Sequence, residues 1–185
     1  MRQRIRTGVL VGLMVGGAMT PGVAAQTPAA AQIARGKYLA DTGGCHDCHS
    51  PKKMGAQGPE VDVEKQLSGF QADVKLPPAP KVPEGGPWAA VATWDLNAWS
   101  GPWGMSYAAN LTPDVATGLG SWSEAMFVNA IRTGKHMGSG RPILPPMPWQ
   151  TIGKMTDADL KALFAYLKSL KAVKNLVPAP APPAK

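Results

Sequence analysis

Apolar residues recur at helical spacing near the C-terminal end of this 185-residue chain. After the sequence TDAD they occupy positions i, i+3, i+4 and i+7, as Leu160, Leu163, Phe164 and Leu167. Residues at this spacing share one face of a helix, and Thr156 is a suitable N-cap just before them. The pattern therefore predicts an amphipathic helix that starts after Thr156.

Two earlier segments are also predicted to be helical. The first of these predicted helices covers residues 30–42, AAQIARGKYLADT. Four of its residues are available for packing: Ile33, Gly36, Tyr38 and Leu39. At SWSE, Ser121 and Glu124 have the spacing of a capping box, which favours a helix through Phe127, Ala130 and Ile131. Gly134 then supplies a residue type that commonly ends helices.

The long segment between the first and second of these helices has a different composition. Residues 76–88, LPPAPKVPEGGPW, are rich in proline, and four tryptophans recur nearby: Trp88, Trp94, Trp99 and Trp103. No run of alternating apolar residues favours a β-sheet. We therefore expect a compact helical core with a long irregular insert at residues 51–107. The tryptophans have two interpretations, a docking face for a partner or apolar packing in a loop-rich domain.

The N-terminus has the pattern of a secretory signal peptide. Residues 1–6 carry three arginines, residues 7–20 are apolar, and Val23 and Ala25 are small residues that suit a signal peptidase. We expect cleavage near Ala25 and export to the periplasm, because the apolar run is too short to span a membrane. The alternative is an uncleaved anchor. Residues 26–175 are then predicted to form one domain, followed by an extended, mobile Pro/Ala-rich tail at 176–185.

The net charge limits the choice of partners only weakly. The whole chain has a formal net charge of +7, and cleavage would remove three arginines and no acidic residue, which leaves +4. The basic residues are scattered, so a nucleic-acid partner is not indicated. A weak preference for acidic protein surfaces is as much as this charge supports.

Both cysteines of the chain lie in GGCHDCHS, residues 43–50, where His49 directly follows Cys48. A zinc site needs four ligands, but the chain has no second cysteine pair, and its other histidines are His46 and His136. A disulfide is compatible with export but leaves His49 without a role. A thiol oxidoreductase would have this motif at the start of a helix in a strand–helix alternation, whereas here a predicted helix precedes it.

Covalent attachment of haem would use all three residues of the C-x-x-C-H motif. Cys45 and Cys48 would bind the two vinyl groups from one side of a tight turn, and the adjacent imidazole of His49 would reach the iron. This spacing is the signature of c-type haem attachment. It is the favoured interpretation, with one haem c per chain.

The motif and its neighbours together resemble class I cytochromes c. GGCHDCHS follows RGKYLA, PPMPW precedes TDADLKALFAYLKSL, and NLTPDVATGLGSWSEAMFVNAIRTGKH is similar to c-type domains in cytochrome subunits of bacterial dehydrogenases. The likeness covers about residues 30–170, although the insert at 51–107 is longer than small members need. It implies an all-α class I cytochrome c fold, with three main helices around one covalent haem. It also implies axial ligation by His49 and a methionine, and electron carriage in the periplasm.

Met147 is the predicted sixth ligand of the iron. It lies in LPPMPWQ between prolines, which stiffen the backbone and let a thioether be held with little further loss of entropy. The resemblance places the axial methionine in the same segment. Met137, Met105 and a second imidazole from His136 are the alternatives, while His46 is expected to be exposed.

These expectations describe an electron carrier rather than an enzyme. Methionine ligation raises the reduction potential relative to two histidines, and a six-coordinate iron leaves no open position for a substrate. Redox partners such as a dehydrogenase, an oxidase or another cytochrome are expected to dock transiently. Two alternatives stay open, a peroxidase-like or gas-binding haem protein and a cytochrome subunit of a dehydrogenase complex. Trp149 is a candidate haem contact, and Arg132 or Arg141 could offset the propionate charge.

Overall fold

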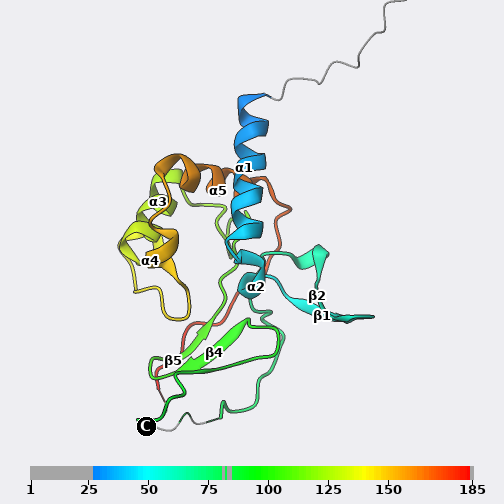
Figure 1. The fold of residues 1–185 in the computed structure, drawn as a ribbon, viewed down its shortest axis with the longest axis vertical. Helices are drawn as coiled ribbons and strands as arrows, with labels where there is room; N and C mark the ends of the chain where they lie inside the picture. The colour runs from blue at the N-terminus through cyan, green and yellow to red at the C-terminus, as the bar shows by residue number, and fades with distance from the viewer. Residues whose placement is uncertain (1–26, 81, 83–84, 184–185) are drawn as a thin grey trace, which may run out of the picture.

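The computed structural model describes residues 27–80, 82 and 85–183. The predicted signal peptide at residues 1–25 lies outside the described residues. Three main helices dominate the fold (Figure 1): α1 (Pro28–Thr42), α3 (Glu124–Thr133) and α5 (Asp157–Ser169). Shorter helical elements are α2 (Cys45–His49), η1 (Val63–Lys65), η2 (His136–Gly138) and α4 (Trp149–Ile152).

The ends of the main helices follow from their capping residues. Thr156 caps α5 by accepting a hydrogen bond from Asp159 N at 3.1 Å, as its position in the sequence predicted. Gly134 ends α3 in the left-handed conformation, with φ of +66°, which also confirms its prediction. The predicted start of α3 is wrong by two residues, because Ser123 and not Ser121 accepts from Met126 N. Residues 121 and 122 belong to a turn in which Trp122 N donates to Leu119 O.

The core forms where α1 crosses α5 and α3 packs beside them. Gly36 lies at the crossing of α1 and α5, and a Cβ at this position would overlap the carbonyl oxygen of Ala162. Glycine therefore lets the two helix backbones approach closely. The buried cluster is completed by apolar residues from all three helices, among them Ala40, Phe127, Ile131, Leu160, Leu163, Phe164 and Leu167.

The insert contains two small antiparallel sheets, so the prediction of an all-α fold is wrong in this part. One sheet pairs β1 (Lys52–Gly55) with β2 (Gly58–Val61). The other has the order β3 (Val91–Ala92), β4 (Ala98–Gly101), β5 (Gly104–Tyr107). These strands have two to four residues, and β1 and β2 bury neither face, so no alternating apolar pattern marks them.

The segment after α5 returns along the insert, toward the lower end of the molecule in Figure 1. Asn175 is buried, and its side chain donates to Ser68 O and Phe70 O and accepts from Ala72 N. Further on, Ala181 pairs with Met105 on the edge of β5 through two backbone hydrogen bonds of 2.8 and 3.1 Å. The described part of the predicted tail is thus extended, and it carries a bridge to the sheet. Among the described helices, none has the length and apolar character needed to cross a membrane.

Candidate metal centre

The C-x-x-C-H motif forms α2, a helix of five residues directly after α1 (Figure 1). Gly44 precedes it with φ of +72°, a conformation that favours glycine and lets the chain turn sharply out of α1. Cys45 and Cys48 stand one helical turn apart, and both thiols are free and partly buried. Residues three apart lie on the same side of a helix, so the turn presents both sulfur atoms in one direction.

His49 is buried, and its ring has one firm hydrogen-bond partner. Its Nδ1 lies 2.8 Å from the carbonyl oxygen of Ala109. A carbonyl can only accept, so Nδ1 carries the proton and Nε2 keeps a free lone pair. Within the described part of the chain, no hydrogen bond reaches Nε2. Burial lowers the pKa of His49, so the imidazole is neutral, which is the form that binds a metal.

The two thiols lack the activation that redox exchange would need. Burial raises the pKa of Cys45 to about 11, and it also raises the pKa of Cys48. Attacking thiols of oxidoreductases have lowered pKa values, so this environment does not fit thiol exchange. Zinc is not supported either, because the described residues contain no group of three or more histidine, cysteine or acidic side chains arranged to hold a metal ion. The donor set that remains is two thiols and one imidazole, which fits a haem c.

Met147 and Cys45 contact the same apolar cluster. Both are partly buried, and both pack against the core made by α1, α3 and α5. Met147 belongs to the loop between η2 and α4, and this loop hangs below α4 at the left of Figure 1. The structure therefore brings the motif and the loop of Met147 to one hydrophobic core.

The three alternative sixth ligands, and Met54 in addition, occupy less suitable places. Met54 is 72% exposed on β1, and Met137 is 40% exposed with a left-handed φ of +54°. Met105 lies within β5, where its backbone pairs with Ala181. His136 is exposed, and its ring stands edge-on to Trp122 with centroids 5.0 Å apart. Of these four side chains, none is found packed against the core cluster.

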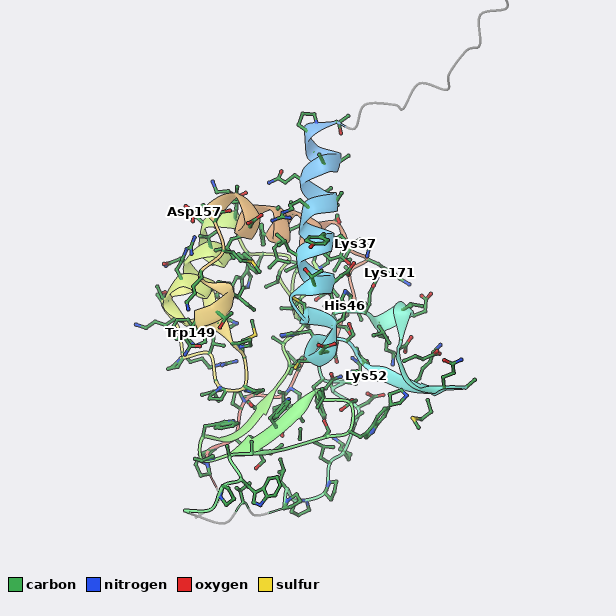
Figure 2. All side chains as sticks on the ribbon, viewed as in Figure 1. Lys37, His46, Lys52, Trp149, Asp157 and Lys171 are labelled. Atoms are coloured by element: carbon green, nitrogen blue, oxygen red, sulfur yellow. The ribbon has the colours of Figure 1, made fainter. Side chains whose placement is uncertain are left out.

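Other residues singled out from the sequence have structural partners. The indole of Trp149 covers Gly134 so closely that a Cβ there would overlap the ring, and Figure 2 shows Trp149 on the α3 and α4 side of the molecule. Arg132 donates to Asp157 at 2.6 Å and to Gly153 O, while Arg141 donates to Pro142 O.

The expectation that His46 is exposed is wrong. Its side chain is 19% exposed, its Nδ1 lies 2.9 Å from Ser50 Oγ, and its Nε2 lies 3.4 Å from Asp41. The ring is held because α2 follows α1 at once and packs against its last turn. Burial lowers the pKa of His46.

Sequence reasoning also missed the residues that hold the motif from outside. Lys52 donates through Nζ to the carbonyl oxygens of Asp47 and Asp95, and Figure 2 shows it between α2 and the β4–β5 sheet. The amide of Asn97 faces the carbonyls of Cys48 and Ser50 and, with its nitrogen turned toward them, donates to both. The partners are backbone atoms, including the Ala109 carbonyl, so no residue pattern reveals them.

Comparison with known proteins supplies the last observation. The sequence model of the cytochrome c family matches residues 33–171. A subunit of nicotinate dehydrogenase from Pseudomonas putida is 33% identical over 159 residues, 86% of this chain. The gluconate 2-dehydrogenase cytochrome c subunit of Pantoea cypripedii is 33% identical over 74% of this chain, and the fructose dehydrogenase cytochrome subunit of Gluconobacter japonicus is 30% identical over 76%. The match spans only 10%, 22% and 22% of these three relatives, respectively.

Proposed function

This chain belongs to the cytochrome c family, whose members bind haem c covalently, and from that premise we propose that it is a periplasmic carrier of single electrons. The family supports haem electron transfer in general. Our proposal adds the residues that bind the haem, its axial ligands and the compartment. One observation carries it: α2 presents two free thiols beside a buried, neutral imidazole whose free nitrogen is Nε2.

In this proposal Cys45 and Cys48 form the two thioether bonds and His49 is the fifth ligand. The hydrogen bond from Nδ1 to Ala109 O fixes the ring in one tautomer and one orientation. Such a bond from the outer nitrogen raises the basicity of a ligating imidazole. Ala109 lies two residues after the end of β5, so the segment that directly follows the insert orients His49.

Met147 is the proposed sixth ligand. Its contact with the core that also contacts Cys45 supports this choice over Met137 and His136, which are exposed. When bound, the haem iron supplies a one-electron ferric–ferrous couple, and a thioether ligand favours its ferrous state. Trp149 stays a proposed haem contact through its position two residues from Met147.

The proposed partner is a dehydrogenase, with this chain as its electron acceptor or as one of its subunits. The second role has specific support, because the similar proteins are named as subunits of nicotinate, gluconate and fructose dehydrogenases. Export through a signal peptide cleaved near Ala25 belongs to the same proposal. So does the division into one cytochrome domain at 26–175 and a tail at 176–185.

A spectroelectrochemical titration of the full chain, produced in a host that attaches haem c, tests the proposal. We expect one reversible wave of one electron per chain, with a ferric form that is low-spin. The ferrous form should bind carbon monoxide only slowly, because a sixth ligand must leave first. Rapid carbon monoxide binding with peroxide turnover would contradict the carrier and favour a haem enzyme with an open sixth position.

A further inference from the structure

The loop that carries Met147 has few hydrogen bonds of its own. Three of its residues are prolines, Pro145, Pro146 and Pro148, which have no backbone N–H to donate. Within the described residues, segment 144–147 makes one hydrogen bond besides the local turn in which Trp149 N donates to Met147 O. In that bond, Ser106 Oγ donates to Pro145 O at 2.6 Å.

Ser106 is well placed to act as a fixed anchor. It lies in β5, its exposed fraction is 7%, and its strand neighbour in the register is Trp99 of β4. Its oxygen accepts a hydrogen bond from the indole Nε1 of Trp103 at 3.2 Å. The hydroxyl therefore accepts one hydrogen bond and donates another, and these two bonds together fix its orientation.

The same sheet also holds the opposite ligand segment. Asn97, directly before β4, is buried, and its side-chain amide faces the Cys48 and Ser50 carbonyls, to which its nitrogen donates when the amide is turned toward them. Lys52 links Asp47 O to Asp95 O, again between α2 and the start of this sheet (Figure 2). The haem-binding turn and the Met147 loop are thus both attached to the sheet of β3, β4 and β5.

We propose that Ser106 is a positioning residue for the sixth ligand, holding the Met147 loop at a fixed distance from α2 through Pro145. This inference rests on the proposed ligation by Met147. It gives the insert at residues 51–107 a role, because its sheet is the common support of the two ligand segments. Ser106 acts through the backbone of Pro145.

The test is Ser106→Ala in the full-length haem protein. Loss of one buried hydrogen bond loosens the loop, and we expect the ferric protein to bind cyanide about three- to tenfold faster. The weak far-red band of iron–methionine ligation should lose intensity, and the midpoint potential should fall. Trp103→Phe keeps the hydrogen bond to Pro145 O but removes the indole donor. It should change the cyanide rate, the band intensity and the midpoint potential in the same directions as Ser106→Ala, but to a smaller extent.

Two matched variants separate positioning from general loss of a buried hydroxyl. Ser68→Ala removes a fully buried hydroxyl elsewhere in the insert. Among the described residues, the Ser68 hydroxyl accepts a hydrogen bond only from the Gln71 side chain. This substitution should leave the far-red band and the rate of cyanide binding unchanged. Ser106→Thr retains the hydroxyl that donates to Pro145 O. Its far-red band and rate of cyanide binding should therefore lie closer to the wild-type values than those of Ser106→Ala.

The outcomes distinguish this inference from the proposed function. A Ser106→Ala protein with the wild-type band and cyanide rate would overturn the positioning role and leave the carrier intact. Equal changes in Ser106→Ala and Ser68→Ala would also overturn it, because the effect would then be general. A wild-type protein without the far-red band would remove Met147 from the iron, and the inference would fall with that assignment.

Discussion

The helical part of the molecule and the insert at residues 51–107 are held by different interactions. In the helical part, α1, α3 and α5 bury apolar residues against one another, and Gly36 allows α1 and α5 to touch. In the insert, single polar side chains such as Asn97 and Ser106 bind backbone atoms of distant segments. Apolar burial stabilises in proportion to area, whereas each of these polar contacts fixes a position.

This difference separates stability from ligand geometry. We expect substitutions in the helical core that do not touch Met147 or Cys45 to change the free energy of unfolding more than the iron spectrum. Substitutions at the polar contacts of the insert should lower the free energy of unfolding by less than core substitutions do. They should instead change the positions of the segments that carry the proposed ligands. The contrast can be tested from both sides.

The largest effect is expected for Leu160→Ala in the helical core. Leu160 is fully buried in α5, so its truncation removes apolar contacts and leaves a cavity. The free energy of unfolding should fall by about 2–5 kcal/mol in denaturant titrations of the haem protein. Leu176→Ala is the matched control, because the same truncation at a residue that is 72% exposed should be nearly silent. A loss below about 1 kcal/mol at Leu160 would contradict a stability centred on this core.

A smaller effect is expected for Asn175→Leu, which keeps the side-chain volume but removes the amide. The Ser68 and Phe70 carbonyls and the Ala72 N–H would lose their partner, so the free energy of unfolding should fall by about 1–3 kcal/mol. Hydrogen exchange of amides in residues 67–72 should accelerate more than exchange in α5. Asn129→Leu is the control, since Asn129 is exposed and its side chain donates only to Gly138 O at 3.3 Å. Equal acceleration of hydrogen exchange in residues 67–72 and in α5 would contradict the claim that polar contacts stabilise the insert independently of the helical core.

The smallest effect is expected for the ion pair between α1 and α5. Arg35 Nε donates to Asp159 at 2.9 Å on the surface, and this hydrogen bond lowers the pKa of the Asp159 carboxyl. Because the folded pKa lies below the unfolded value of about 3.9, the contribution is complete above that pH and is lost as the pH falls toward the folded pKa. Thermal midpoints of wild type and Asp159→Asn should therefore differ slightly at pH 6 and converge on acidification. A difference that grows as the pH falls would refute this assignment.

The sequence predicted the helical part well because its signals are local. The apolar spacing from Leu160 to Leu167, the cap at Thr156 and the stop at Gly134 each lie within or beside the element that they define. The C-x-x-C-H motif is local in the same sense, since three residues within five positions are enough to recognise it.

The insert was not predictable in the same way. Its strands are too short to show a period, and its contacts join residues far apart, as Ser106 and Pro145 show. The partners of His49 and Asn97 are backbone carbonyls, which every residue has. Only packing in three dimensions selects which carbonyl is used, so the sheet and its two attachments emerged from the structure alone.

The assignment of Met147 to the iron is the claim on which the carrier depends, and the ferric absorption spectrum tests it most directly. We predict a weak far-red band in the wild-type protein that is absent in Met147→Ala. The band should persist in Met137→Ala, the matched truncation of an exposed methionine in the same part of the chain. A band that survives Met147→Ala and disappears in Met137→Ala would contradict the assignment.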